Sequence, residues 1–450
     1  MQPDVSVVIV NYNVRYLLEQ CLHSLRHGQH ALSQEIFVVD NASTDGSIPF
    51  LRERFPEVNF IELSENIGFG KANNLALQQC TGKYILILNP DTIVGEDTLQ
   101  VLIAFLKTHP KAGIVTPKLI RKDGALDYAC RRSLPTPWVA FSRLTGLSML
   151  FPKSRLFSQY NLTYLNDDEP AQIGAGTGAF LLMPQEIYQK VGGFDEQFFM
   201  YGEDLDLCAR VQDAGYEIHY RPETTAVHYR GESTRRSNID RNQAFYGAML
   251  LYAEKHYKGW ARGYGIALLK IGILLAHWFA GFSQFWSFTW PAVVDSILIA
   301  LGLFLGQWLR WGGVFGAVDK RVLVANVILV LLALGSTGTF LARDRESVKP
   351  ALKGAALAGF ISGTFTLFLL QGIMFSRAVV LISSMLWLVL LPGWRWLLFV
   401  KWGNQLIHKK RLLRTALIIG TDDLAKMLGE RLQTDPSEYE FAGFVRYRNV

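Results

Sequence analysis

The sequence predicts an α/β domain built on a parallel sheet, then a helical membrane region and a short second α/β unit. Three observations support this prediction. Apolar strand-like runs alternate with amphipathic helical stretches through residues 1–262, a pattern typical of parallel sheets. Long apolar runs dominate residues 264–400, and several are long enough to cross a membrane. A strand–helix–strand pattern returns in residues 412–450.

Composition narrows the class of protein. The 450 residues exceed one ordinary domain, and half of them are hydrophobic. The net charge is +6, with many basic residues beside the apolar runs, which indicates anionic lipid headgroups rather than nucleic acid. The 4 cysteines are widely spaced, so neither a zinc site nor a disulfide framework is indicated. The N-terminus lacks a signal-peptide pattern, and we expect the first domain to stay in the cytosol.

Polar loops follow the predicted strands at residues 5–10, 35–39, 59–63 and 83–88. The carboxyl ends of parallel strands meet at one sheet edge, where open α/β sheets bind ligands. The candidate binding residues in or just after these loops are Asn11, Asn13, Asp40, Asn41, Asn66, Lys71, Asn73, Asn89 and Asp91. Asp40 can accept hydrogen bonds from a base or ribose, and Asp91 with Asn89 can hold a divalent cation. Turn chemistry explains any one such loop, but several on one edge favour a binding site.

Acidic residues stand among aromatic ones at residues 193–207. Glu203, Asp204 and Asp206 begin a predicted helix with acids in its first turn. A partly dry cleft raises the pKa of a carboxylate and prepares it to accept a proton. A helix start with solvated charges explains the same residues.

The motifs closely resemble those of family 2 inverting glycosyltransferases, and most closely the bacterial rhamnosyltransferase-like branch. The resemblance extends over residues 4–235 in order and at ordinary family spacing. The motifs that carry it are residues 8–13, 38–47, 66–69, 88–91, 176–181, 191–196 and 202–207. The resemblance implies a GT-A fold with a Rossmann-like sheet and a nucleotide-diphosphate-sugar donor.

The resemblance also implies roles for single residues. Asp40 would contact the base of the donor, and the other loop residues would help to bind it. Asp91 would be the surviving acid of the D-x-D motif that binds Mn²⁺ or Mg²⁺, with Asn89 in place of the first acid. Asp204 would deprotonate the acceptor hydroxyl, and Glu203 is its nearest rival.

His228 would complete the metal or diphosphate contacts, although a lone histidine more often has only a structural role. Arg230, Arg235 and Arg236 follow it and either fold over the phosphates or form a basic linker. Residues 127–170 look like an insertion over the acceptor site, and its apolar stretch 147–151 either touches lipid or forms an aromatic core patch.

The membrane part has two predicted sections. Residues 263–288 form an interfacial amphipathic helix, because polar residues recur on one stripe of an aromatic-rich segment; a tilted spanning helix is the alternative. Residues 289–402 form a four-helix transmembrane region. The four stretches that are long enough to span are residues 291–309, 322–342, 354–376 and 378–400. The basic clusters after the second and fourth stretches are expected in the cytosol.

Residues 412–450 are predicted to begin a Rossmann-like unit that is incomplete. Residues 290–450 resemble, more weakly, the N-terminal part of polyprenyl-phosphate phosphosugar transferases. Only Gly420 stands where a dinucleotide fingerprint needs three glycines, so we expect no dinucleotide here.

The expected function is transfer of a single sugar to a lipid-linked polyprenyl diphosphate acceptor in cell-surface polysaccharide synthesis. Single addition is expected because the Q-x-x-R-W motif of processive synthases is absent from the sequence. The branch resemblance suggests dTDP-rhamnose as donor, and a multi-pass protein in the lipids of the bacterial inner membrane with its catalytic domain in the cytosol. Two alternatives stay open: the front half of a bifunctional glycosyltransferase and phosphosugar transferase, or a non-catalytic nucleotide-sugar-binding scaffold.

Overall fold

A computed structural model describes most of the chain. The chain forms two compact units, Met1–Phe279 and Ala280–Val450. The described residues are 2–28, 32–229, 240–312, 320–340, 348–368, 376–398, 414–419 and 439–445.

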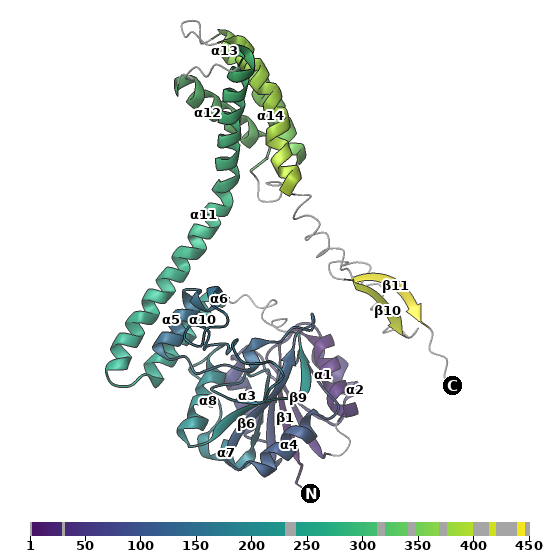
Figure 1. Ribbon diagram of the computed structural model, residues 1–450. Coiled ribbons are helices and arrows are strands. Elements are labelled where there is room, and N and C mark those ends of the chain that lie inside the picture. The colour runs from purple at the N-terminus through teal and green to yellow at the C-terminus, as the bar shows by residue number, and fades with distance from the viewer. Residues whose placement is uncertain are drawn as a thin grey trace. The chain divides into compact units, whose positions relative to one another are not determined.

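The first unit is built on a sheet whose parallel part agrees with the sequence prediction (Figure 1). Its strands are β1 (Val5–Asn11), β2 (Gln34–Asp40), β3 (Val58–Glu62) and β4 (Tyr84–Leu88), in the order β3-β2-β1-β4. The connecting helices are α1 (Arg15–Gly28), α2 (Ser47–Arg54) and α3 (Phe69–Leu77). The chain moves outward from β1 to β3 and then returns to the other side of β1. Such a reversal of strand order leaves a crevice at the carboxyl ends of the strands.

The other half of the sheet is mixed, whereas the sequence predicts parallel strands alone. Strand β8 (Phe180–Pro184) runs antiparallel to β4 and to β6. The remaining strands are β5 (Thr92–Val94), β6 (Ala112–Ile120), β7 (Ala171–Ile173) and β9 (Glu217–His228). Strand β8 is apolar and buried along most of its length, and such a run looks the same in either direction. The hydrophobic pattern therefore identifies the strand but not its orientation.

The other helices of this unit cover the sheet and border the crevice. They are α4 (Thr98–Thr108), the 3₁₀ turn η1 (Tyr128–Cys130), α5 (Pro137–Leu144), α6 (Leu147–Leu150), α7 (Gln185–Val191), α8 (Glu203–Asp213) and α10 (Arg241–His256). Helix α8 begins after two consecutive left-handed residues, Tyr201 (φ 70°) and Gly202 (φ 83°). A tyrosine rarely adopts this conformation, and such backbone strain is concentrated at functional sites.

Helix α11 (Trp260–Trp311) is continuous over 52 residues and carries Pro291 in its interior. The second unit contains its later part together with α12 (Lys320–Ser336), α13 (Val348–Phe368) and α14 (Arg377–Leu398). Among the described residues, three helical segments are long and apolar enough to cross a membrane: Trp260–Ser283, Thr289–Trp311 and Arg377–Leu398. The predicted stretches 322–342 and 354–376 each extend into residues outside the description.

A buried ion pair joins two helices of the second unit. Asp295 on α11 and Arg395 on α14 are fully buried and form a two-pronged ion pair with N–O distances of 2.8 and 2.7 Å. Beyond the helices, β10 (Arg414–Ile419) and β11 (Tyr439–Val445) pair in parallel. The helix expected at 424–432 lies outside the described residues.

Candidate active site at the carboxyl edge of the sheet

The loops after β1 and β2 are joined by side-chain hydrogen bonds. Asn11 Nδ2 donates to Asp40 Oδ1 at 2.7 Å and to Ser43 Oγ at 3.1 Å. The other oxygen of Asp40 accepts from the Ser43 amide at 3.0 Å. Asn13 Oδ1 accepts from the Thr44 amide at 2.7 Å. These bonds give the loops a defined shape, and Asp40 is buried among them.

A second pair of asparagines joins β2 to the start of α3. Asn41 Nδ2 donates to Asn66 Oδ1 at 2.9 Å, and Asn41 Oδ1 accepts from the Ile67 amide at 2.9 Å. Both asparagines line a cavity of about 710 Å³. Asn73 instead donates to the Phe69 carbonyl of its own helix at 2.9 Å, and Lys71 lies exposed on α3.

The cavity gathers some of the predicted site residues and leaves others out. Those that line it are Asn41, Asn66, Asn89, Glu203, Asp204 and His228. The cavity wall does not include Asn11, Asn13, Asp40, Lys71, Asn73 or Asp91. The predicted arginines Arg230, Arg235 and Arg236 lie outside the described residues.

Asp91 and His228 meet at the end of β4 and β9. Their Oδ1 and Nε2 atoms are 3.3 Å apart, and His228 Nδ1 lies 2.8 Å from Asp127 Oδ2. Burial alone would lower the pKa of His228, but its bonds to Asp127 and Asp91 raise the pKa to about 9. A proton on Nε2 therefore supplies positive charge between two buried carboxylates.

The same two residues fit a divalent cation. Two ligands of one cation lie about 3 Å apart when each metal–ligand bond is about 2.1 Å, close to the observed separation. Asp127 bonded to Nδ1 directs Nε2 toward Asp91, as carboxylates behind metal-binding histidines do. In the described part of the chain no group of three or more His, Cys, Asp or Glu forms a metal site. Further oxygen ligands would have to come from water or a phosphate-bearing ligand.

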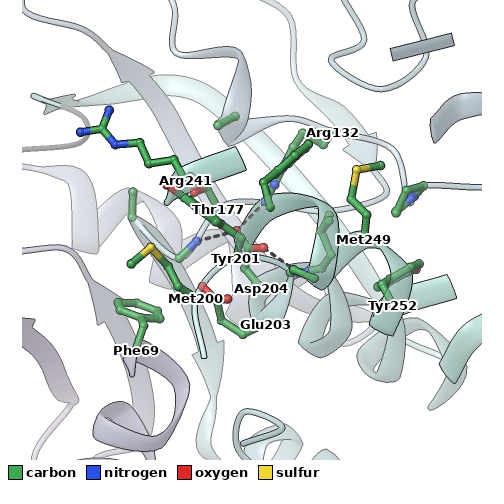
Figure 2. Close-up of a pocket in the computed structure, with 18 of the residues that line it drawn as sticks. Phe69, Arg132, Thr177, Met200, Tyr201, Glu203, Asp204, Arg241, Met249 and Tyr252 are labelled. Carbon is green, nitrogen blue, oxygen red and sulfur yellow. Dashed lines mark hydrogen bonds and ion pairs between the residues drawn. The ribbon is translucent and has the colours of Figure 1, made fainter. Parts of the chain in front are cut away.

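Asp204 lies in the first turn of α8 and points into the cavity (Figure 2). Its Oδ2 atom accepts from Arg132 Nη2 at 2.7 Å and from the Gly178 amide at 3.2 Å. Its Oδ1 atom accepts from the Leu205 amide at 2.8 Å. These three donors fix the orientation of both carboxylate oxygens. Asp204 is thus held at one place on the cavity wall.

Glu203 differs from its neighbour in its environment. Burial, followed by repulsion from Asp204, raises the pKa of Glu203 to about 8. Its Oε2 atom is buried and has no hydrogen-bond partner among the described residues. The raised pKa favours the protonated form of Glu203 at pH 7, which favours Asp204 as the base.

The raised pKa predicts that Glu203 destabilises the fold as pH rises. The folded protein keeps this proton up to about pH 8, whereas a solvated glutamate loses it near pH 4.3. Between these values the unfolded chain binds fewer protons, so the free energy of unfolding falls with rising pH. This fall in the free energy of unfolding is on the order of 1 kcal/mol per pH unit, and we expect Glu203→Gln to remove it. Thermal unfolding of the wild type and of Glu203→Gln in detergent at pH 5 and pH 8 measures this effect. If the unfolding temperatures of the two proteins differ by the same amount at both pH values, the raised pKa of Glu203 is contradicted.

Two residues of the site lack a sequence signal. Asp127 holds His228, and Arg132 holds Asp204. Both come from the segment 127–170, where no motif or periodicity marks them. Their types give the only clue, because a buried acid and a buried arginine need partners.

Comparison with known proteins gives the site a context. Residues 6–191 match the model described as glycosyl transferase family 2, and residues 170–231 match one described as N-terminal domain of galactosyltransferase. The chain is 28% identical over 277 residues to the N-acetylglucosaminyl-diphospho-decaprenol L-rhamnosyltransferase of Mycobacterium tuberculosis, covering 58% of this chain and 88% of the relative. It is 31% identical over 178 residues to rhamnosyltransferase WbbL of Escherichia coli, covering 37% of this chain and 63% of the relative.

Solved structures are also similar to this chain. The mannosyltransferase PcManGT from Pyrobaculum calidifontis, in complex with GDP-Man and Mn²⁺, is 17% identical with a TM-score of 0.40. This similarity covers 86% of this chain and 87% of the other.

Proposed function

We propose that this chain, whose residues 6–191 match the model described as glycosyl transferase family 2, transfers one sugar from a nucleotide-diphosphate-sugar donor to a lipid-linked acceptor. The observation that carries this proposal is Asp204, an oriented carboxylate on the wall of a cavity at the edge of the sheet. The relative named for a diphospho-decaprenol substrate supports a polyprenyl diphosphate acceptor, and both relatives support rhamnose as the sugar.

The proposed reaction is a single displacement that inverts the anomeric carbon. Asp204 takes the proton from the acceptor hydroxyl, the hydroxyl oxygen bonds to the anomeric carbon, and the bond from that carbon to the donor phosphate breaks. The nucleoside diphosphate leaves with the electron pair. One base suffices, because no covalent enzyme intermediate forms.

We propose that Asp91 and His228 hold a divalent cation, Mn²⁺ or Mg²⁺, when the donor binds. Such a cation neutralises charge on the leaving diphosphate. Asn41 and Asn66 shape the donor side of the cavity. The bonds of Asp40 and Asn13 keep the two neighbouring loops in place.

The helices also bear on the location of the protein. We propose a multi-pass protein of the bacterial cytoplasmic membrane with the first unit in the cytosol. The three apolar helices support membrane association. The sections 263–288 as an interfacial helix and 289–402 as a four-helix region stay part of this proposal.

Incubation with a panel of nucleotide sugars tests the function. The full chain in lipid receives each donor with Mn²⁺ or Mg²⁺, with and without a polyprenyl-diphosphate acceptor. We expect release of nucleoside diphosphate from one donor, increased by the acceptor. No release from any donor, with nucleotide binding retained, would refute catalysis and favour a scaffold.

Removal of the cation should stop this release, and Mn²⁺ or Mg²⁺ should restore it. We expect Asp127→Asn to raise the metal concentration for half-maximal activity by about 10–100-fold, because Asp127 orients His228. Asp91→Asn should raise it at least as much. Asp123→Asn, on an exposed loop, is the matched control. Activity that is unchanged by a chelator would refute the cation.

A further inference from the structure

The cavity continues beyond Asp204, away from the loops at the sheet edge. Figure 2 shows Met249 and Tyr252 on the opposite side of Asp204 from Phe69. We call this far side the apolar lobe; it is lined by Pro135, Ala140, Met249, Tyr252, Tyr257 and Leu269. Tyr257 donates its hydroxyl proton to the Pro135 carbonyl at 2.6 Å, so its ring rather than its oxygen is available. A lobe of this kind favours an apolar ligand.

One wall of the apolar lobe belongs to a membrane-type helix. Leu269 lies in Trp260–Ser283, a segment long and apolar enough to cross a membrane. Helix α5 packs along the same segment: a Cβ at Gly265 would lie 2.7 Å from Pro137 Cγ, and one at Gly272 would lie 3.4 Å from Leu144 Cβ. The two pairs are two turns apart on both helices, so the helices run side by side in one direction.

The other face of this segment is exposed and apolar. Tyr264, Ile271, Leu274 and Trp278 recur at helical spacing and are each at least half exposed. An aromatic-rich apolar face of this kind fits the boundary of a bilayer. The segment therefore has lipid-compatible residues on one side and the apolar lobe on the other. The cavity that Asp204 lines therefore has part of its wall on a lipid-compatible helix.

A cation stands beside the apolar lobe. Arg143, in the last turn of α5, lines the cavity and is half-buried. Its guanidinium carbon lies 5.9 Å from the centre of the Tyr160 ring. No acid is paired with it in the part of the chain that the structure describes, whereas Arg131, Arg132 and Arg210 are each paired with an aspartate. An arginine without a carboxylate partner suits a phosphate ligand.

We propose that the apolar lobe binds the diphosphate end of an isoprenoid-linked acceptor, with Arg143 on the diphosphate and the lobe around the first isoprene units. This inference rests on the proposed function, because it assigns the acceptor side of the same cavity. The diphosphate and the apolar chain would then fix the acceptor sugar beside Asp204.

Binding of farnesyl diphosphate to the full chain in detergent tests this site without turnover. The titration is run with a chelator, which suppresses metal-assisted binding on the donor side. We expect Arg143→Gln to weaken the affinity about tenfold or more, as loss of a charge-assisted hydrogen bond does. Arg143→Lys should keep part of the affinity.

Arg155→Gln is the matched control, because this arginine also lies 5.9 Å from a tyrosine ring, that of Tyr164, but outside the cavity wall. Equal affinity of the Arg143→Gln and wild-type proteins would overturn the proposal, as would an equal loss in Arg155→Gln. Inorganic diphosphate that binds as tightly as farnesyl diphosphate would exclude the apolar lobe. Arg143-dependent binding without sugar transfer would support this site and refute the proposed function. Sugar transfer without such binding would do the reverse.

Discussion

Asp204→Asn is expected to lower the rate of sugar transfer by about 10²–10⁴-fold, the usual contribution of a general base. An amide keeps the shape of the side chain but cannot take a proton from the acceptor hydroxyl. Donor binding should persist, because the asparagines near the nucleotide side are unchanged. Release of nucleoside diphosphate under saturating donor measures the rate, and donor titration measures binding. A near-wild-type rate would exclude Asp204 as the base.

The substitution also leaves Arg132 buried without its charged partner, which can unfold the site for reasons unrelated to proton transfer. The double variant Asp204→Asn with Arg132→Gln is therefore the control, because it removes both charges. We expect it to unfold at a temperature closer to that of the wild type and to stay inactive. Glu203→Gln keeps Asp204 and should retain most of the activity. Loss of activity in Glu203→Gln together with full activity in Asp204→Asn would mean that Glu203, not Asp204, is the base.

Much of this site was predictable because its elements follow local rules. The first, second and fourth strands contain apolar runs, and polar residues follow all four strands; parallel strands bring such ends to one edge. The acids at the start of α8 were also predictable, because aromatic neighbours indicate a partly dry cleft. In the structure Glu203, Asp204 and Asp206 are all buried, so the alternative of solvated charges at a helix start is wrong.

The partners of these acids could not be predicted in the same way. Arg132 and Asp204 are 72 residues apart, and Asp127 and His228 are 101 residues apart. Packing of residues 127–170 against the cavity brings them together, and no local periodicity encodes such a contact. The apolar lobe has the same origin, since α5, α10 and α11 each supply part of its wall.

Substitution of Asp206 is expected to have the largest effect on the stability of the fold. It is fully buried and lies 2.8 Å from Arg210 Nε, 2.6 Å from Lys255 Nζ and 2.8 Å from His256 Nε2. Lys255 and His256 belong to α10, so this carboxylate ties α8 to α10. We expect Asp206→Ala to lower the free energy of unfolding by about 3–5 kcal/mol, as removal of one partner of a buried ion pair does. Asp213→Ala, on the exposed end of α8, should change it by less than about 0.5 kcal/mol.

The pH dependence separates an ionic contribution from lost packing. Burial opposes the charge of Asp206, but the bonds from His256, Lys255 and Arg210 outweigh it and hold the pKa well below its usual range. A depressed pKa stabilises the fold above the unfolded value near pH 3.9, and this stabilisation is lost as pH falls below it. The wild type should therefore unfold at a higher temperature than Asp206→Asn at pH 6, and this difference should become smaller as the pH falls to 3. Because α8 carries Asp204 and α10 carries Met249 and Tyr252, a loosened link should also weaken farnesyl diphosphate binding. If the difference in unfolding temperature between the wild type and Asp206→Asn stays constant with pH, packing rather than charge holds the two helices together.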